Sequence, residues 1–263
     1  MINTGLPSIH IKEMGRFSHA FGLIAIGSYL LAILSLTACS KDNSAPKQGF
    51  SLPQTYTEDV RSSVVGNSIT TYNLSYDGQG RLLEMTSTSS PTFKTSYQYS
   101  GSSYTSDMYN NGVLQIHEMY WLNSASLVDS TLQYNNTQDT TTERYIYDVN
   151  KALIQKTQYE YHQVGAIPIS VTSYTYDNSG NLVSESTNTG TSTQYTYTNL
   201  PNANFYQTYF PQSKYLVNTA TISVGGFLKT ATHSYSFDSN NRLSRDSVYT
   251  TGTDLIVVKS YTY

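Results

Sequence analysis

The fold of this chain is decided by residues 174–182, which read Tyr-Thr-Tyr-Asp-Asn-Ser-Gly-Asn-Leu. Tyr174 and Tyr176 alternate with polar residues, so both rings point to one face of a strand. Asp177 suits the first position of a type I turn, because its carboxylate accepts hydrogen bonds from backbone N–H groups ahead of it. Gly180 suits the fourth position, which needs positive φ in a hairpin with a bulge. With Leu182 beginning a return strand, the stretch predicts two strands joined by a tight turn.

The same unit recurs along the chain, which indicates an array of similar hairpins. The Asp and the glycine of the turn recur as Asp77 with Gly80, while Asp148 and Asp238 have Lys151 and Asn241 in the glycine's place. A side chain at Lys151 makes positive φ costly, and Asn241 tolerates it better. The related stretches are residues 72–82, 145–153 and 235–243, and 109–114 is a degenerate copy that lacks the Asp and has Gly112 as its fourth turn residue.

Composition favours an all-β chain. The 263 residues include 25 Tyr, and only 13% are charged. Tyr and β-branched residues favour pleated surfaces, and few segments repeat apolar residues at the spacing of a helix. The net charge of −3, without clustered Lys or Arg, argues against nucleic acid as a partner.

The N-terminus has the layout of a secretory leader. An apolar run of 16 residues, 21–36, follows Lys12 and Arg16. It ends in Leu36, Thr37, Ala38 and Cys39, which resemble the lipobox of bacterial lipoproteins. In those lipoproteins the leader is cleaved just before the cysteine, and the cysteine sulfur becomes attached to a diacylglycerol. The alternative is a chance cysteine in a signal peptide or membrane anchor, and either Met1 or Met14 could be the start.

These patterns divide the chain into a lipoprotein signal peptide (1–39), a flexible tether (40–55) and an antiparallel β domain (56–263). Cys39 is the only cysteine, so no disulfide supports the domain. The residues after Cys39 resemble the charged stretch of surface-exported lipoproteins of one large Gram-negative phylum. We therefore expect an outer-membrane protein, lipid-anchored through Cys39, at the cell surface or on the periplasmic face.

From Tyr56 onward the chain predicts about sixteen short strands. We expect an antiparallel meander of hairpins that each carry the Tyr-Asp (YD-like) turn described above. The hairpins should form a large curved or partly closed sheet, preceded by a signal helix and a disordered tether. Rings at alternate positions would form a dry face, with Thr, Ser and Gln on the wet one. Residues 199–215 interrupt the pattern with two prolines and four aromatics, so this loop either plugs the sheet or binds a partner.

The units at 72–82, 174–182 and 235–243 resemble the YD repeat of Rhs-type proteins, whose repeats build long spiralling sheets. The spacing here is longer than the YD period. A nearer resemblance is to small lipoproteins of the same phylum, an uncharacterised family described as having a porin-like or open antiparallel β fold. The shared motifs are structural, so the resemblance implies no catalytic residues.

No constellation of catalytic or metal-binding residues is evident. His117, His162 and His233 are isolated from other ligand types in sequence, so we expect no metal and no cofactor. The repeated Asp residues could in principle hydrolyse glycosides as pairs, but each begins a turn that explains it. The lone tryptophan and the loop aromatics could stack on sugars or fill the sheet, and the candidate glycan contacts are Trp121, Phe205, Tyr206, Tyr209 and Phe210.

The sequence therefore predicts a non-enzymatic, membrane-anchored lipoprotein with a surface-binding or structural role. The alternatives are a glycan-binding accessory lipoprotein and a periplasmic envelope-assembly component, with a surface glycan or an envelope protein as partner. A membrane-inserted barrel ranks lower, because it needs strands of about 9–11 residues with apolar bands facing lipid. Here Thr and Ser occupy many of the alternate positions.

Overall fold

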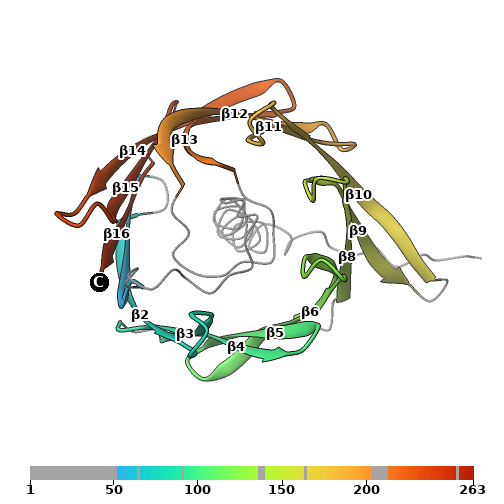
Figure 1. Ribbon diagram of the computed structural model, residues 1–263, viewed down its shortest axis with the longest axis horizontal. Helices are drawn as coiled ribbons and strands as arrows, with labels where there is room; N and C mark the ends of the chain where they lie inside the picture. The colour runs from blue at the N-terminus through green and yellow to red at the C-terminus, as the bar shows by residue number, and fades with distance from the viewer. Residues whose placement is uncertain are drawn as a thin grey trace, which may run out of the picture. The chain divides into compact units, whose positions relative to one another are not determined.

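The structure is a computed structural model that describes residues 52–63, 66–89, 92–135, 140–162, 165–202, 213–252 and 255–263. Within these ranges, sixteen strands form one closed antiparallel barrel in which each strand pairs with its neighbours in sequence (Figure 1). The strands are β1 (Thr55–Arg61), β2 (Ser68–Tyr76), β3 (Leu82–Ser87), β4 (Phe93–Ser100), β5 (Ser103–Asn110), β6 (Val113–Leu122), β7 (Val128–Asn135), β8 (Thr140–Tyr147), β9 (Leu153–His162), β10 (Gly165–Tyr176), β11 (Leu182–Thr187), β12 (Thr191–Pro201), β13 (Tyr215–Val224), β14 (Phe227–Phe237), β15 (Leu243–Thr250) and β16 (Ile256–Thr262).

Closure is made by the first and last strands. β1 pairs with β16 from Thr55 opposite Thr262 to Arg61 opposite Ile256. The all-β antiparallel meander predicted from sequence is confirmed, but the partly closed sheet is wrong, because this pairing removes both free edges. The predicted signal helix and most of the tether lie outside the described residues.

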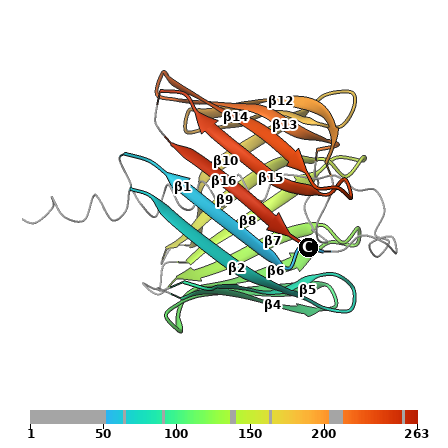
Figure 2. The same ribbon diagram turned by 90° about the vertical axis from the view of Figure 1, so that its left-hand side faces the viewer.

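The barrel has two different rims. Even-numbered strands end, and odd-numbered strands begin, at a rim that carries the Asp turns and the C-terminus; we call it the turn rim. The opposite end, reached by the hairpins β1–β2, β5–β6, β9–β10 and β13–β14 among others, is the far rim. Figure 2 shows the strands from the side, inclined between these two rims.

Tyrosine rings recur along the inner face of the wall. The register places Tyr56 beside Tyr72 and Tyr261, and the same face continues around the barrel through Tyr104. The side chains of Tyr56 and Tyr104 are no more than 9% exposed. A convex outer surface cannot cover whole rings in this way, so the buried face is the inner one. A cluster of buried residues joins β5 to β11 along this face: Tyr104, Val128, Tyr145, Leu153, Tyr174 and Leu182.

Tyrosine hydroxyls tie neighbouring strands together near the turn rim. Tyr147 near the end of β8 donates to the carbonyl of Val128 at the start of β7, at 2.6 Å. We call each such bond a tyrosine latch. Seven latches lie in the described part of the chain. Most reach from an even-numbered strand to the strand before it, but Tyr76 reaches Pro53 just ahead of β1, and Tyr263 lies just after β16. The latches are Tyr76 to Pro53, Tyr99 to Leu82, Tyr147 to Val128, Tyr176 to Leu153, Tyr197 to Leu182, Tyr235 to Val217 and Tyr263 to Leu243.

Candidate functional site

The repeated aspartates hold turns. One carboxylate oxygen of Asp177 accepts the backbone N–H groups of Ser179 and Asn181, at 2.8 and 2.9 Å, and the other accepts the Asn181 side-chain amide. Asp77, Asp148 and Asp238 each accept the N–H groups two and four residues ahead in the same way. Positive φ at Gly80, Lys151, Gly180 and Asn241 completes these turns. The carboxylates are thus engaged in hairpin structure.

A further turn of this type begins at Asn123, which the sequence motif did not reveal. Its amide oxygen accepts the N–H groups of Ala125 and Leu127, and Ser126 takes the positive φ. The degenerate copy at residues 109–114 is a different structure. Asn111 and Gly112, at φ 50° and 78°, form the two-residue turn between β5 and β6 at the far rim.

Acidic side chains on the inner face are paired with tyrosine. Tyr195 donates to Glu185 at 3.0 Å, and the same contact joins Tyr56 to Glu58, Tyr120 to Glu118 and Tyr145 to Glu143. Burial raises the pKa of Glu118 above its ordinary value. Among the residues that the structure describes, no group of three or more His, Cys, Asp or Glu could hold a metal ion.

Trp121 lies on the outer face, beside other aromatic residues. On β6, Trp121 is 40% exposed and flanked across the sheet by Ser103 and Ser130. Four residues earlier, roughly 13 Å along the strand, His117 stacks on Tyr134 with ring centroids 6.2 Å apart. His117 Nδ1 lies 2.5 Å from an oxygen of Asp107. We call Asp107, His117, Trp121 and Tyr134, with Met119 and Leu132 between them, the aromatic stripe.

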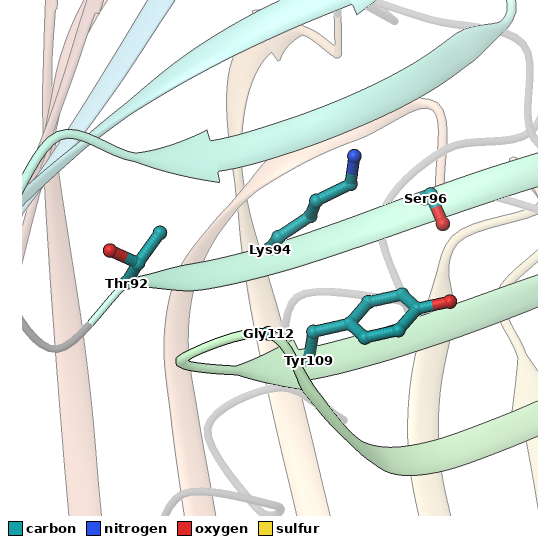
Figure 3. A pocket seen from close by; sticks show the side chains of 5 residues that line it. All are labelled: Thr92, Lys94, Ser96, Tyr109 and Gly112. Carbon is teal, nitrogen blue, oxygen red and sulfur yellow. The ribbon is translucent and has the colours of Figure 1, made fainter.

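A shallow hollow of about 290 Å³ adjoins the stripe. It is lined by Thr92, Lys94, Ser96, Tyr109 and Gly112, from β4 and β5 with their adjoining turns (Figure 3). Ser96 is paired across the sheet with Asp107 of the stripe, so the two features form one surface. Lys94 also forms an ion pair with Glu84 on β3. The combined surface carries ring faces, hydroxyls and charges along β4, β5 and β6.

The remaining predicted site residues lie outside the described residues. These are Cys39, the lipobox residues Leu36, Thr37 and Ala38, and the loop aromatics Phe205, Tyr206, Tyr209 and Phe210. β12 extends to Pro201 and β13 begins at Tyr215, so the predicted interruption at 199–215 is shorter than expected. In the described part of the chain, no helix is long and apolar enough to cross a membrane.

Comparison with known proteins identifies a fold. A crystal structure of a porin-like protein from Bacteroides uniformis matches 80% of this chain and 97% of its own, at 14% identity and a TM-score of 0.59. A porin-like protein from Bacteroides vulgatus covers 80% and 98%, at 14% identity and a TM-score of 0.48. No family model and no curated protein matches the chain. The chain therefore has the fold of a porin-like β-barrel.

This similarity corrects the resemblance drawn from sequence. The expectation of an open sheet related to the YD repeats of Rhs-type proteins is wrong, because the similar structure is porin-like and the hairpins here close into a ring. The Tyr-Asp motif is a local rule for making a turn. It specifies the hairpin and leaves the curvature of the sheet undetermined.

Proposed function

We propose that this protein is a non-enzymatic lipoprotein of the bacterial envelope, in which a water-exposed β-barrel is held at the outer membrane by acylated Cys39. The observation that carries the proposal is the polar outer face of the wall. Outward positions on β12 and β14 are occupied by Ser192, Gln194, Thr196, Thr230, Thr232, Ser234 and Ser236.

Charged side chains also occupy the outer face. Arg61 and Asp59 pair at 2.5 Å on β1, and Lys94 pairs with Glu84 across β3 and β4. A Lys or Arg facing lipid at the middle of a bilayer costs roughly 2–4 kcal/mol, and lipid-facing walls carry a continuous apolar band. A wall of this composition favours water, so attachment to the membrane needs a separate anchor, which the lipobox cysteine would supply.

Accessibility of single cysteines tests whether the wall stands in water. Gln194 is outward and exposed, whereas its neighbour Thr193 is inward and 6% exposed. In membrane fragments opened so that the reagent reaches both faces, we expect Gln194→Cys to react with a membrane-impermeant maleimide and Thr193→Cys to stay unlabelled. Protection of Gln194→Cys until detergent is added would place the wall in lipid and contradict the proposal.

The anchor has its own test. Cells fed an alkyne fatty acid should label the wild-type protein, and Cys39→Ser should abolish the label because no other cysteine is present. Protease treatment of intact cells then distinguishes the two faces of the outer membrane. Loss of the barrel indicates surface display, and survival until the outer membrane is broken indicates the periplasmic face.

A second candidate function, glycan binding, is favoured by the exposure of Trp121. Sugar rings stack on exposed aromatic faces, and a stripe of roughly 13 Å could hold two to three sugar units. We expect Trp121→Ala to weaken retention on immobilised polysaccharides about ten-fold, which corresponds to about 1.4 kcal/mol. Tyr249→Ala is the matched control, because Tyr249 is an outward aromatic, 48% exposed, on distant β15. Equal effects of both substitutions, or no effect of either, would exclude the stripe as the site.

A further inference from the structure

Strongly exposed apolar side chains gather at the far rim. In the β13–β14 hairpin, Phe227 is 78% and Leu228 70% exposed. Similar side chains stand at the same end of three other hairpins: Ile69 beside the β1–β2 turn, Val113 and Leu114 after the β5–β6 turn, and Ile167 and Ile169 early in β10. Adjoining exposed apolar side chains, such as Phe227 with Leu228 and Val113 with Leu114, mark an interaction surface more often than isolated apolar residues do.

The positions of these hairpins indicate a flat partner. The hairpins β1–β2, β5–β6, β9–β10 and β13–β14 recur every four strands around the ring. Their tips are thus distributed over the whole circumference and reach the same end of the barrel. A globular protein would contact one side of such a ring, whereas a bilayer surface contacts all of it.

The turn rim carries fewer large exposed apolar side chains. Its described turns include the charged residues Asp77, Arg81, Lys151, Asp177 and Arg242, although Val149 is also exposed there. The far rim has Arg61 at the end of β1 but more of the large exposed apolar side chains. The far rim is therefore better suited to the boundary between head groups and acyl chains, where exposed apolar side chains are buried.

The length of the tether permits this orientation. Cys39 is 16 residues ahead of Thr55, and an extended chain spans at most roughly 50–58 Å over that length. The longest strand, β10, has 12 residues and measures roughly 40 Å. A chain anchored at Cys39 can therefore run from the bilayer to the start of β1 while the far rim rests on the membrane.

We propose that exposed apolar side chains at the far-rim ends of four hairpins insert into the surface of the membrane that holds the lipid anchor; these are Ile69, Val113, Leu114, Ile167, Ile169, Phe227 and Leu228. The barrel then stands upright on the bilayer, with the turn rim and Trp121, near the turn-rim end of β6, in water. This inference rests on the proposed lipid anchor.

Fluorescent probes at the two rims test the orientation. The acylated full chain is purified, and an environment-sensitive dye is attached to Leu228→Cys or, as the matched control, to Val149→Cys; Val149 is 98% exposed at the turn rim. Each protein is reconstituted into phosphatidylethanolamine and phosphatidylglycerol vesicles containing a nitroxide lipid. We expect the Leu228 probe to be quenched roughly two-fold or more relative to the Val149 probe. Adding Phe227→Ser and Val113→Ser should reduce that quenching while the protein stays with the vesicles.

The possible outcomes separate the rim from the anchor. If the protein is acylated and sediments with vesicles but both probes remain in water, the rim proposal is overturned and the anchor stands. If the Leu228 probe is shielded without nitroxide quenching, protein rather than lipid covers the rim, and the proposal is also overturned. Absence of the fatty-acid label would refute the anchor itself, and the rim proposal with it.

Discussion

At the scale of single residues, one acceptor oxygen at the head of each turn holds two backbone N–H groups. Asp177 and Asn123 do this with different side chains, a carboxylate and an amide, yet with the same two contacts. The first turn position therefore requires a planar side chain whose oxygen lies within hydrogen-bond distance of the N–H groups two and four residues ahead. A negative charge is secondary to the geometry.

This requirement predicts different effects for two substitutions of Asp177. Asp177→Ala removes the three hydrogen bonds that the carboxylate accepts and should lower the free energy of unfolding by about 1 kcal/mol, since the site is largely exposed. Asp177→Asn retains an acceptor and should cost less. Thermal unfolding measures both, and equal losses would show that charge is what the turn needs.

The pH dependence of the same turn follows from the pKa of Asp177. Burial raises that pKa, but hydrogen bonds from the Asn181 side chain and from nearby backbone N–H groups outweigh burial and lower it overall. A lowered pKa contributes stability above the unfolded value of about 3.9 that is lost as the pH falls through the folded value. The wild type should therefore lose more stability than Asp177→Asn below about pH 4.

Single residues also show the limits of the sequence motif. The Asp turns could be predicted because their chemistry is local. The turn at Asn123 was missed because Asn replaces Asp and Ser126 takes a φ of 59° that glycine usually adopts. The Asn111-Gly112 pair was assigned to the wrong class because the same residue types also form two-residue turns.

At the scale of strands and hairpins, the tyrosine latches add hydrogen bonds between strands that the turns already join. Each latch joins the end of one strand to the start of its neighbour, beside the turn rim. On β6 the hydroxyl of Tyr120 instead donates to Glu118, and the hairpin that follows is the one built on Asn123. This hairpin therefore keeps the two backbone contacts of the turn without a latch of this kind between the described strands β6 and β7.

Removing one latch should have a small and specific cost. Tyr147→Phe retains the ring and deletes the hydroxyl that donates to Val128, so we expect a loss of about 1 kcal/mol. Thermal unfolding should show a decrease of roughly 2–4 °C. Tyr249→Phe, on an exposed outward ring, should leave the melting temperature unchanged. Equal shifts for both variants would contradict a role for the latch.

Hairpin geometry also decided which rings face inward. The alternation Tyr-x-Tyr places residues of one strand on one face, but register shifts occur beside the turns, as between Ile146 and Tyr147 opposite β9. Tyr159 consequently pairs with Thr142 on the outer face, although sequence spacing grouped it with the packed rings. Such shifts depend on how two strands meet, which a single-strand pattern does not contain.

At the scale of the whole molecule, the barrel wall is a ring of buried tyrosines whose hydroxyls are mostly donors. Burial raises the pKa of Tyr197 and of Tyr263 to about 12. A tyrosine with a raised pKa contributes its full stability below the unfolded value of about 10 and loses it as the pH rises through the folded value. The deprotonated group also can no longer donate its hydrogen bond.

We therefore expect alkaline unfolding to be cooperative. Between about pH 10 and 12, tyrosinate absorbance and loss of the β circular dichroism signal should develop together. Full ionisation near the ordinary tyrosine pKa, with the barrel intact, would show that the inner rings are accessible to water.

Closure of the sheet into a ring could not be predicted from the sequence. The number of strands and their antiparallel order follow from local patterns, and both an open and a closed sheet satisfy those patterns. Closure depends on the pairing of β1 with β16, strands from the two ends of the domain. For the candidate site, too, the sequence showed single residues but not their arrangement. Trp121 was identified as a candidate, but Asp107, His117 and Tyr134 are brought onto the same surface only by pairing of β5, β6 and β7.

The pairing of β1 with β16 has a consequence for how the protein is made. During synthesis, β1 leaves the ribosome first and has to wait for the final residues, Ile256–Thr262, before its second edge is covered. Until then the nascent chain carries two open edges, which are templates for aggregation. A premature stop codon that deletes only the last strand would leave a chain with fifteen intact strands and no way to finish folding.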